Sequence, residues 1–136
     1  GAEARVRREL LSQGWKLRDE CLVLEDDRVY HVICFSRLNG ASQEEIEQKA
    51  AGLLEGIFRE SIPSPEIIRK VIWQLGPFVL IKKERLLIRI LNDSLSRARK
   101  VILEMSKTGR EDVGLQADKL KQEIKIMEGI RTWLLQ

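Results

Sequence analysis

The sequence begins with a helical pattern of apolar positions that stops at Gly14. Three apolar residues share one face at helical spacing: Val6, Leu10 and Leu11. Charged residues take other positions, among them Arg5, Arg8 and Glu9. This spacing predicts a first helix whose apolar face is buried and whose charged side chains face solvent.

After Gly14 the pattern becomes that of β-strands. β-Branched and aromatic residues dominate residues 15–24 and 28–35, with a polar turn between the two runs, so we expect two antiparallel strands. The second run is apolar at both alternating sets of positions, and the strand should therefore be covered on both faces. One set consists of Val29, Ile33 and Phe35, and the other of Tyr30, Val32 and Cys34.

Two helices with clear boundary signals follow. Ser42 and Glu45 have the spacing of a capping box, which predicts a helix over residues 43–60. Pro65 suits the first position of a shorter helix, and Gly76 suits its end.

The stretch after Gly76 allows two interpretations, a β-hairpin over residues 78–91 or the start of a long helix. An apolar heptad repeat consists of Ile81, Ile88, Leu95 and Ile102. This repeat continues well beyond the segment that a hairpin would explain. We therefore favour a short strand over residues 78–81 and a helix over residues 84–107, with the hairpin as the alternative.

A final helical pattern begins with acidic residues after Gly109 and pairs naturally with the helix before it. The predicted class is α+β: an N-terminal helix and β-hairpin, then a mostly helical remainder ending in an antiparallel helical hairpin. We expect one domain over residues 1–136, with the β-containing part at about 1–80 and the helical hairpin at about 84–135.

Composition is that of a globular chain, with 43% hydrophobic and 33% charged residues. No apolar run reaches the roughly 18 to 20 residues of a membrane-spanning helix, and no signal-peptide pattern is present. We therefore expect a cytoplasmic or otherwise intracellular protein without membrane insertion. Cys21 and Cys34 lack the spacing of a metal or redox motif, and whether they pair is left open.

Charge is distributed unevenly along the sequence. Residues 1–68 carry nine Lys or Arg against 13 Asp or Glu, whereas residues 69–110 carry 11 Lys or Arg against three Asp or Glu. A solvated helical face normally mixes the two signs more evenly than this segment does. The basic segment is therefore the strongest functional signal in the sequence.

Motifs for catalysis are absent: no phosphate-binding loop, dinucleotide fingerprint, zinc-protease motif or nucleophile elbow occurs. His31 is the one histidine, and we interpret it as a hydrogen-bonded core residue. The sequence thus favours a non-enzymatic binding domain with no cofactor and no metal.

We predict that the basic residues contact a polyanion, most readily nucleic acid, through its backbone phosphates. The predicted contact residues are Arg69, Lys70, Lys82, Lys83, Arg85, Arg89, Arg97, Arg99, Lys100 and Lys107. Residues 82–107 contain no Phe, Tyr or Trp for base stacking, so binding should depend little on base sequence.

The alternative is a protein–protein module in which the basic face meets an acidic protein surface or the helical hairpin forms a homodimer. In that case apolar side chains of the two last helices would form the interface: Leu95, Ile102, Leu120, Ile124 and Met127.

Overall fold

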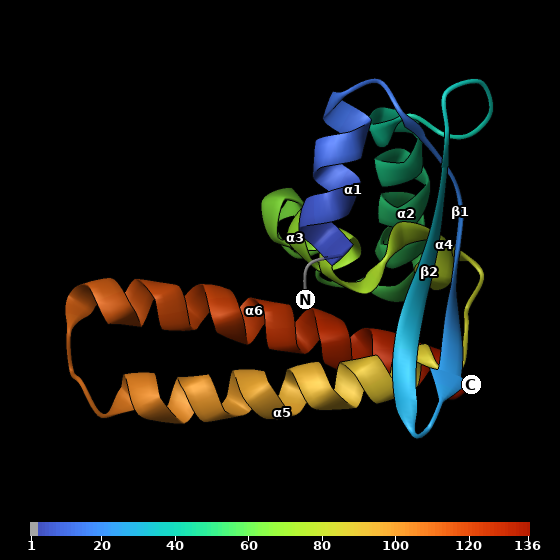
Figure 1. Ribbon diagram of the computed structural model, residues 1–136. Coiled ribbons are helices and arrows are strands. Elements are labelled where there is room, and N and C mark those ends of the chain that lie inside the picture. Colours follow the sequence, from blue (N-terminus) through green and yellow to red (C-terminus); the bar gives the residue numbers. More distant parts are fainter. Residues whose placement is uncertain (1–2) are drawn as a thin grey trace.

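The protein is described by a computed structural model over residues 3–136, which confirms the α+β class (Figure 1). The first two residues of the sequence lie outside the described range. In chain order the elements are α1 (Glu3–Ser12), β1 (Lys16–Glu25), β2 (Arg28–Ser36), α2 (Gln43–Ile57), α3 (Pro65–Leu75), α4 (Pro77–Ile81), α5 (Leu87–Ser106) and α6 (Glu111–Leu134).

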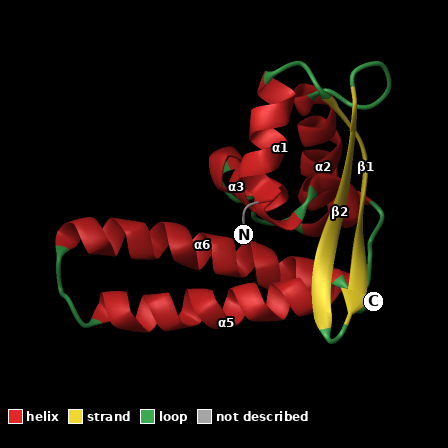
Figure 2. Cartoon of the chain, viewed as in Figure 1, coloured by secondary structure: helices red, strands yellow, loops and turns green. Residues whose placement is uncertain are grey.

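The two strands form the expected antiparallel hairpin, which lies at one edge of the molecule beside the helices (Figure 2). Asp26 and Asp27 form its two-residue turn with φ angles of 47° and 64°. Positive φ at both central residues is the requirement of a type I′ turn, and Asp tolerates it better than most side chains do. The acidic turn therefore fixes the register in which Glu25 faces Arg28.

The helices α2 and α3 begin where their local signals predict. Ser42 Oγ accepts a hydrogen bond of 3.3 Å from the Glu45 amide, as in a capping box. Pro65 is the first residue of α3, which ends at Leu75 because Gly76 has a φ of 105°.

The prediction of a strand over residues 78–81 is wrong, and so is the alternative hairpin over residues 78–91. The segment forms the short helix α4, in which Pro77, Val79 and Leu80 are buried. Lys83 has a φ of 54° and separates α4 from α5, so the long helix begins at Leu87 rather than at residue 84. The heptad repeat therefore runs through a break in the helix.

The buried face of α1 also differs from the predicted one. Arg7 is completely buried, whereas Val6, which we placed on the apolar face, is 41% exposed. Arg5, Arg8 and Glu9 are exposed, as predicted. The rotation of the helix brings Arg7 rather than Val6 against β1 and α3 because Arg7 has a charged partner there.

The core lies where α2, α3 and α4 meet the inner face of the hairpin and the near ends of α5 and α6. Leu87, Leu91 and Leu95 of α5 are fully buried, as are Ile126 and Ile130 of α6. Full burial of each such side chain stabilises the fold by about 1.5–3 kcal/mol. The antiparallel pair α5 and α6, which we call the arm, extends from this core beyond the rest of the molecule (Figure 1).

Candidate nucleic-acid interface

The ten predicted contact residues lie on α3, on the connection between α4 and α5, and on α5. All of them are exposed except Lys83, which is half-buried. Their side chains differ in what they contact, and this difference decides which of them can bind a further anion.

Half of the predicted contact residues already pair with a carboxylate. The pairs and their N···O distances are Lys70–Glu123 (2.7 Å), Lys82–Asp19 (2.9 Å), Arg89–Asp27 (3.2 Å), Arg99–Glu128 (2.9 Å) and Lys107–Glu104 (3.2 Å). In addition, the Lys83 ammonium lies 4.9 Å from the centre of the Trp133 ring. Five of these six side chains join different elements of the fold, whereas Lys107 pairs with Glu104 at the end of the same helix.

The side chains of the other four, Arg69, Arg85, Arg97 and Lys100, have no ion pair or hydrogen bond to any described residue. On α5, the positions of Arg89, Arg97 and Lys100 share one exposed side at helical spacing. We call these three residues the basic ridge. Asp93 lies on the same side between Arg89 and Arg97, so the ridge is a row of separate cations rather than a continuous positive track.

A groove of about 920 Å³ lies beside the basic ridge, between the body and the arm. Arg69 of α3 and Arg97 of α5 line it, and Arg8 of α1 joins them from a third element. Glu66 and Asp93 also line the groove, so its charge is mixed. The sequence analysis missed Arg8 as a site residue because it lies in the acidic half of the chain, where no excess of positive charge marks it.

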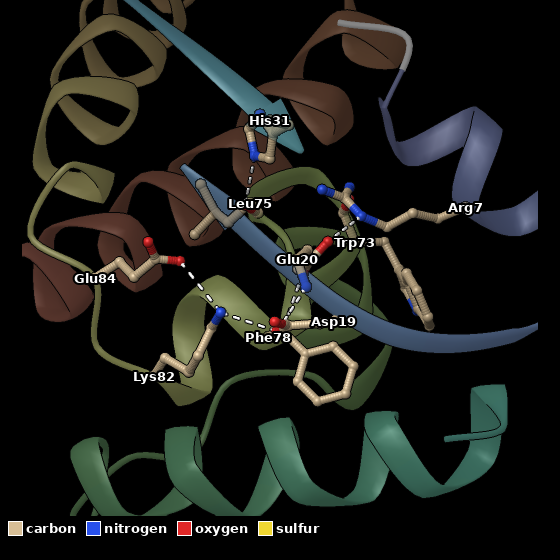
Figure 3. Close-up of polar contacts among 9 residues, drawn as sticks. All are labelled: Arg7, Asp19, Glu20, His31, Trp73, Leu75, Phe78, Lys82 and Glu84. Carbon is tan, nitrogen blue, oxygen red and sulfur yellow. Dashed lines mark hydrogen bonds and ion pairs between the residues drawn. The ribbon is translucent and has the colours of Figure 1, made fainter. Parts of the chain in front are cut away.

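A buried polar network fixes α1 against α3 and so holds the walls of this groove in place (Figure 3). Arg7 Nε donates to Glu20 Oε2 over 2.7 Å, and Arg7 Nη1 donates to the Trp73 carbonyl oxygen over 2.9 Å. Glu20 Oε1 accepts from the Phe78 amide over 2.7 Å. A Cβ on Gly76 would lie 2.9 Å from Glu20 Oε1, so this position requires glycine.

His31 supports the same segment from β2. Its Nε2 atom lies 3.2 Å from the Leu75 carbonyl oxygen, to which the tautomer protonated at Nε2 donates. The last residue of α3 is therefore bonded to the hairpin, in agreement with the interpretation of His31 as a hydrogen-bonded structural residue.

A second cluster of polar side chains joins β1 to the start of the arm. Lys82 donates a hydrogen bond of 2.9 Å to Asp19 and thereby lowers the pKa of that carboxyl group. Partial burial opposes the charge of Lys82, but the hydrogen bond to Asp19 and the neighbouring carboxylates outweigh it and raise the pKa of the Lys82 ammonium. Glu84 accepts a hydrogen bond of 3.2 Å from the Leu22 amide on the same strand.

The residues of the predicted dimer interface lie mainly between the two helices of the arm. Leu95 and Met127 are buried, and the other three are half-buried: Ile102, Leu120 and Ile124. Their apolar surface is thus largely committed within the chain, and the dimer stays an untested prediction.

Within residues 3–136, no group of three or more His, Cys, Asp or Glu side chains is arranged to hold a metal ion. Both cysteines have free thiols. Among the same residues, no helix combines the length and apolar character needed to cross a bilayer.

No protein-family model matches the sequence, and no curated protein sequence matches it. One solved structure that shares the fold is the tRNA methyltransferase TrmK of B. subtilis, with a TM-score of 0.63 and 14% sequence identity. The match covers 94% of this chain and 47% of that one. The chain therefore spans about half the length of the protein that it resembles, and at this identity the resemblance concerns the fold.

This comparison contradicts the prediction of a non-enzymatic chain. The fold occurs within an enzyme, so the missing catalytic motifs do not assign the chain to the non-enzymatic binding domains. The error came from searching for short motifs, because an enzyme whose catalytic residues are dispersed along the sequence need not contain one.

Proposed function

We propose that the chain holds structured RNA by its phosphate backbone, as part of an enzyme that modifies RNA. The observation that carries the proposal is the set of exposed cations without carboxylate partners, Arg69, Arg85, Arg97 and Lys100. Arg is suited to this role because its planar guanidinium donates two parallel hydrogen bonds to phosphate.

The resemblance to a tRNA methyltransferase supports RNA over other polyanions. The shared fold makes up 47% of that enzyme, and we assign the holding of RNA to these 136 residues. Contacts from separate cations to individual phosphates give affinity with little dependence on base sequence. A folded RNA should therefore be recognised by the spacing of its phosphates.

Arg89 has a place in this proposal although it pairs with Asp27. The Asp27 side chain is 89% exposed, and an exposed ion pair contributes little stability, so a phosphate can replace the carboxylate at small cost. The ridge would then supply three cations along one side of α5, with Arg69 and Arg85 nearby on α3 and before α5.

The test is fluorescence anisotropy with a labelled tRNA transcript and a DNA duplex of similar length, at about 50 and about 150 mM salt. The double variant Arg97→Glu/Lys100→Glu should bind the tRNA about tenfold or more weakly, and the slope of log affinity against log salt should fall by about 2. Lys121→Glu/Lys125→Glu is the matched control, since it changes the net charge equally at exposed positions on the other helix of the arm, α6.

The control variant should weaken binding by no more than about threefold, because charge away from the contact acts only through screened, long-range attraction. Equal losses for both variants would show that net charge alone attracts RNA. Unchanged affinity of the Arg97→Glu/Lys100→Glu variant, with an unchanged circular dichroism spectrum, would exclude the ridge as the contact surface.

A further inference from the structure

One face of the β-hairpin is apolar and exposed. Leu22 and Val29 point to the inner face and pack on the core, so the alternate residues of each strand point outward. The outward residues include Cys21, Val23, Tyr30, Val32 and Cys34, which we call the outer face, and the charged Asp19 lies opposite Cys34 at one end of it. Val23, Tyr30 and Val32 are 42%, 48% and 51% exposed. The sequence predicts that β2 is covered on both faces, yet described residues cover only one.

The two edges of the hairpin differ as well. The edge of β1 is occupied: Leu17 exchanges hydrogen bonds of 3.0 and 2.9 Å with Ala41, and the Leu22 amide donates to Glu84. The opposite edge is that of β2, and no backbone hydrogen bond joins its residues 29–35 to any described residue outside the hairpin. The hairpin thus has one closed and one open edge.

The open edge carries none of the features that keep a strand from pairing. Between Arg28 and Ser36, β2 contains no Pro, Lys, Gly or bulge, and its side chains are mostly β-branched or aromatic. Such an edge readily accepts another strand, and a two-stranded sheet is by itself only marginally stable. An open edge and an uncovered face therefore meet on the same strand.

We infer that a further α/β polypeptide segment docks on β2, adding a strand along its open edge and a helix over the outer face. A second copy of the chain does not satisfy both requirements. Pairing of two β2 edges would leave Tyr30 and Val32 in water, and packing of two outer faces would leave both edges open. A strand followed by a helix covers the edge and the face together.

The comparison with TrmK agrees with this occupant, because the fold seen here is joined there to about as much polypeptide again. The inference does not rest on RNA binding, since the basic ridge lies on α5 and the outer face on β1 and β2. Either proposal can therefore fail without the other.

Cys34 is an exposed thiol on the outer face and serves as a natural reporter. In the purified 136-residue chain it should react freely with N-ethylmaleimide. In cells that make the protein naturally, the reaction should be slower by at least about tenfold, because the docked helix shields the thiol. A Leu38→Cys variant is the control: Leu38 is 85% exposed outside the outer face, so its thiol should react equally in both settings.

A photo-reactive p-benzoylphenylalanine in place of Val32 identifies the occupant in the same cells. The expected adduct joins residue 32 to one polypeptide segment outside residues 1–136 whose apolar positions recur with a helical period. An adduct with residues 28–36 of a second copy would overturn the inference in favour of a dimer. Equal reactivity of Cys34 in both settings would also overturn it, because the outer face would then be open to water.

Discussion

Replacing Arg7 by Met should lower the free energy of unfolding by about 4 kcal/mol. Both side chains of the Arg7–Glu20 pair are fully buried, so the change leaves a buried carboxylate whose remaining donor is the Phe78 amide. Breaking a buried ion pair by removing one partner costs about 3–5 kcal/mol. The Trp73 carbonyl oxygen loses its Arg7 donor in the same variant, which keeps the expected cost in the middle of that range or above.

Urea unfolding followed by circular dichroism measures this loss. At an m-value of about 2 kcal/mol/M, the midpoint should fall by about 2 M. Arg5→Met is the matched control: Arg5 is 80% exposed and pairs with Glu9, so the change should stay within about 0.5 kcal/mol.

A second substitution separates the buried charge from simple loss of packing. Glu20→Gln keeps an oxygen that can accept from the Phe78 amide but removes the negative charge. Arg7→Met/Glu20→Gln should therefore be more stable than Arg7→Met alone. A loss below about 1 kcal/mol for Arg7→Met, or a double variant less stable than the single one, would refute the reasoning from a buried charge pair.

Two further predictions concern the same part of the fold. Gly76→Ala should destabilise the protein by about 2 kcal/mol or more in urea unfolding, because its φ of 105° and the nearby Glu20 carboxylate both oppose a Cβ. By contrast, Gly52→Ala, with open space around its Cβ in α2, should be neutral or stabilising. The pKa of Asp19, read by NMR titration, should lie below 3.8 and return towards that value in Lys82→Met. The pKa of Asp19 is lower in the folded than in the unfolded chain, so the pair with Lys82 stabilises the fold at pH values above the unfolded pKa. This contribution is lost as the pH falls through the folded pKa. A free energy of unfolding that stays constant through that pH range would contradict the assignment.

Local signals in the sequence predicted most of the secondary structure. The acidic turn, the capping box at Ser42 and the boundaries of α3 each depend on residues within four positions of one another. Such signals act before the chain is packed and are therefore visible in the sequence. The α+β class followed from them.

The segment Pro77–Ile81 could not be assigned in the same way. It is short and mostly buried, and in such a run neither a period of 3.6 nor a period of two is visible. Its helical form depends on the backbone reversals at Gly76 and Lys83, where φ is 105° and 54°. A positive φ at Lys83 has no signal in the sequence, because Lys rarely adopts it.

The candidate site shows a different limit of sequence reasoning. Counting acids within residues 69–110 gave three, which suggested that most of the cations lacked partners. In the structure, four of the six carboxylates that pair with the predicted contact residues come from outside that segment: Asp19, Asp27, Glu123 and Glu128. The burial of Arg7 in place of Val6 has the same cause, since the partner of Arg7, Glu20, lies on another element. A count of charges along the sequence does not reveal ion pairs between residues that are brought together only by folding.

The arm also has the geometry of a lever whose fixed end lies in the core. With 20 residues, α5 is about 30 Å long, and its buried leucines all lie in the half nearer the body. A tilt of about 5° at that end moves the far end by about 3 Å while the packed end hardly shifts. Arg89 lies near the packed end of the arm and Lys107 at its far end. In the proposed complex with RNA, such a tilt would therefore move Lys107 much more than Arg89.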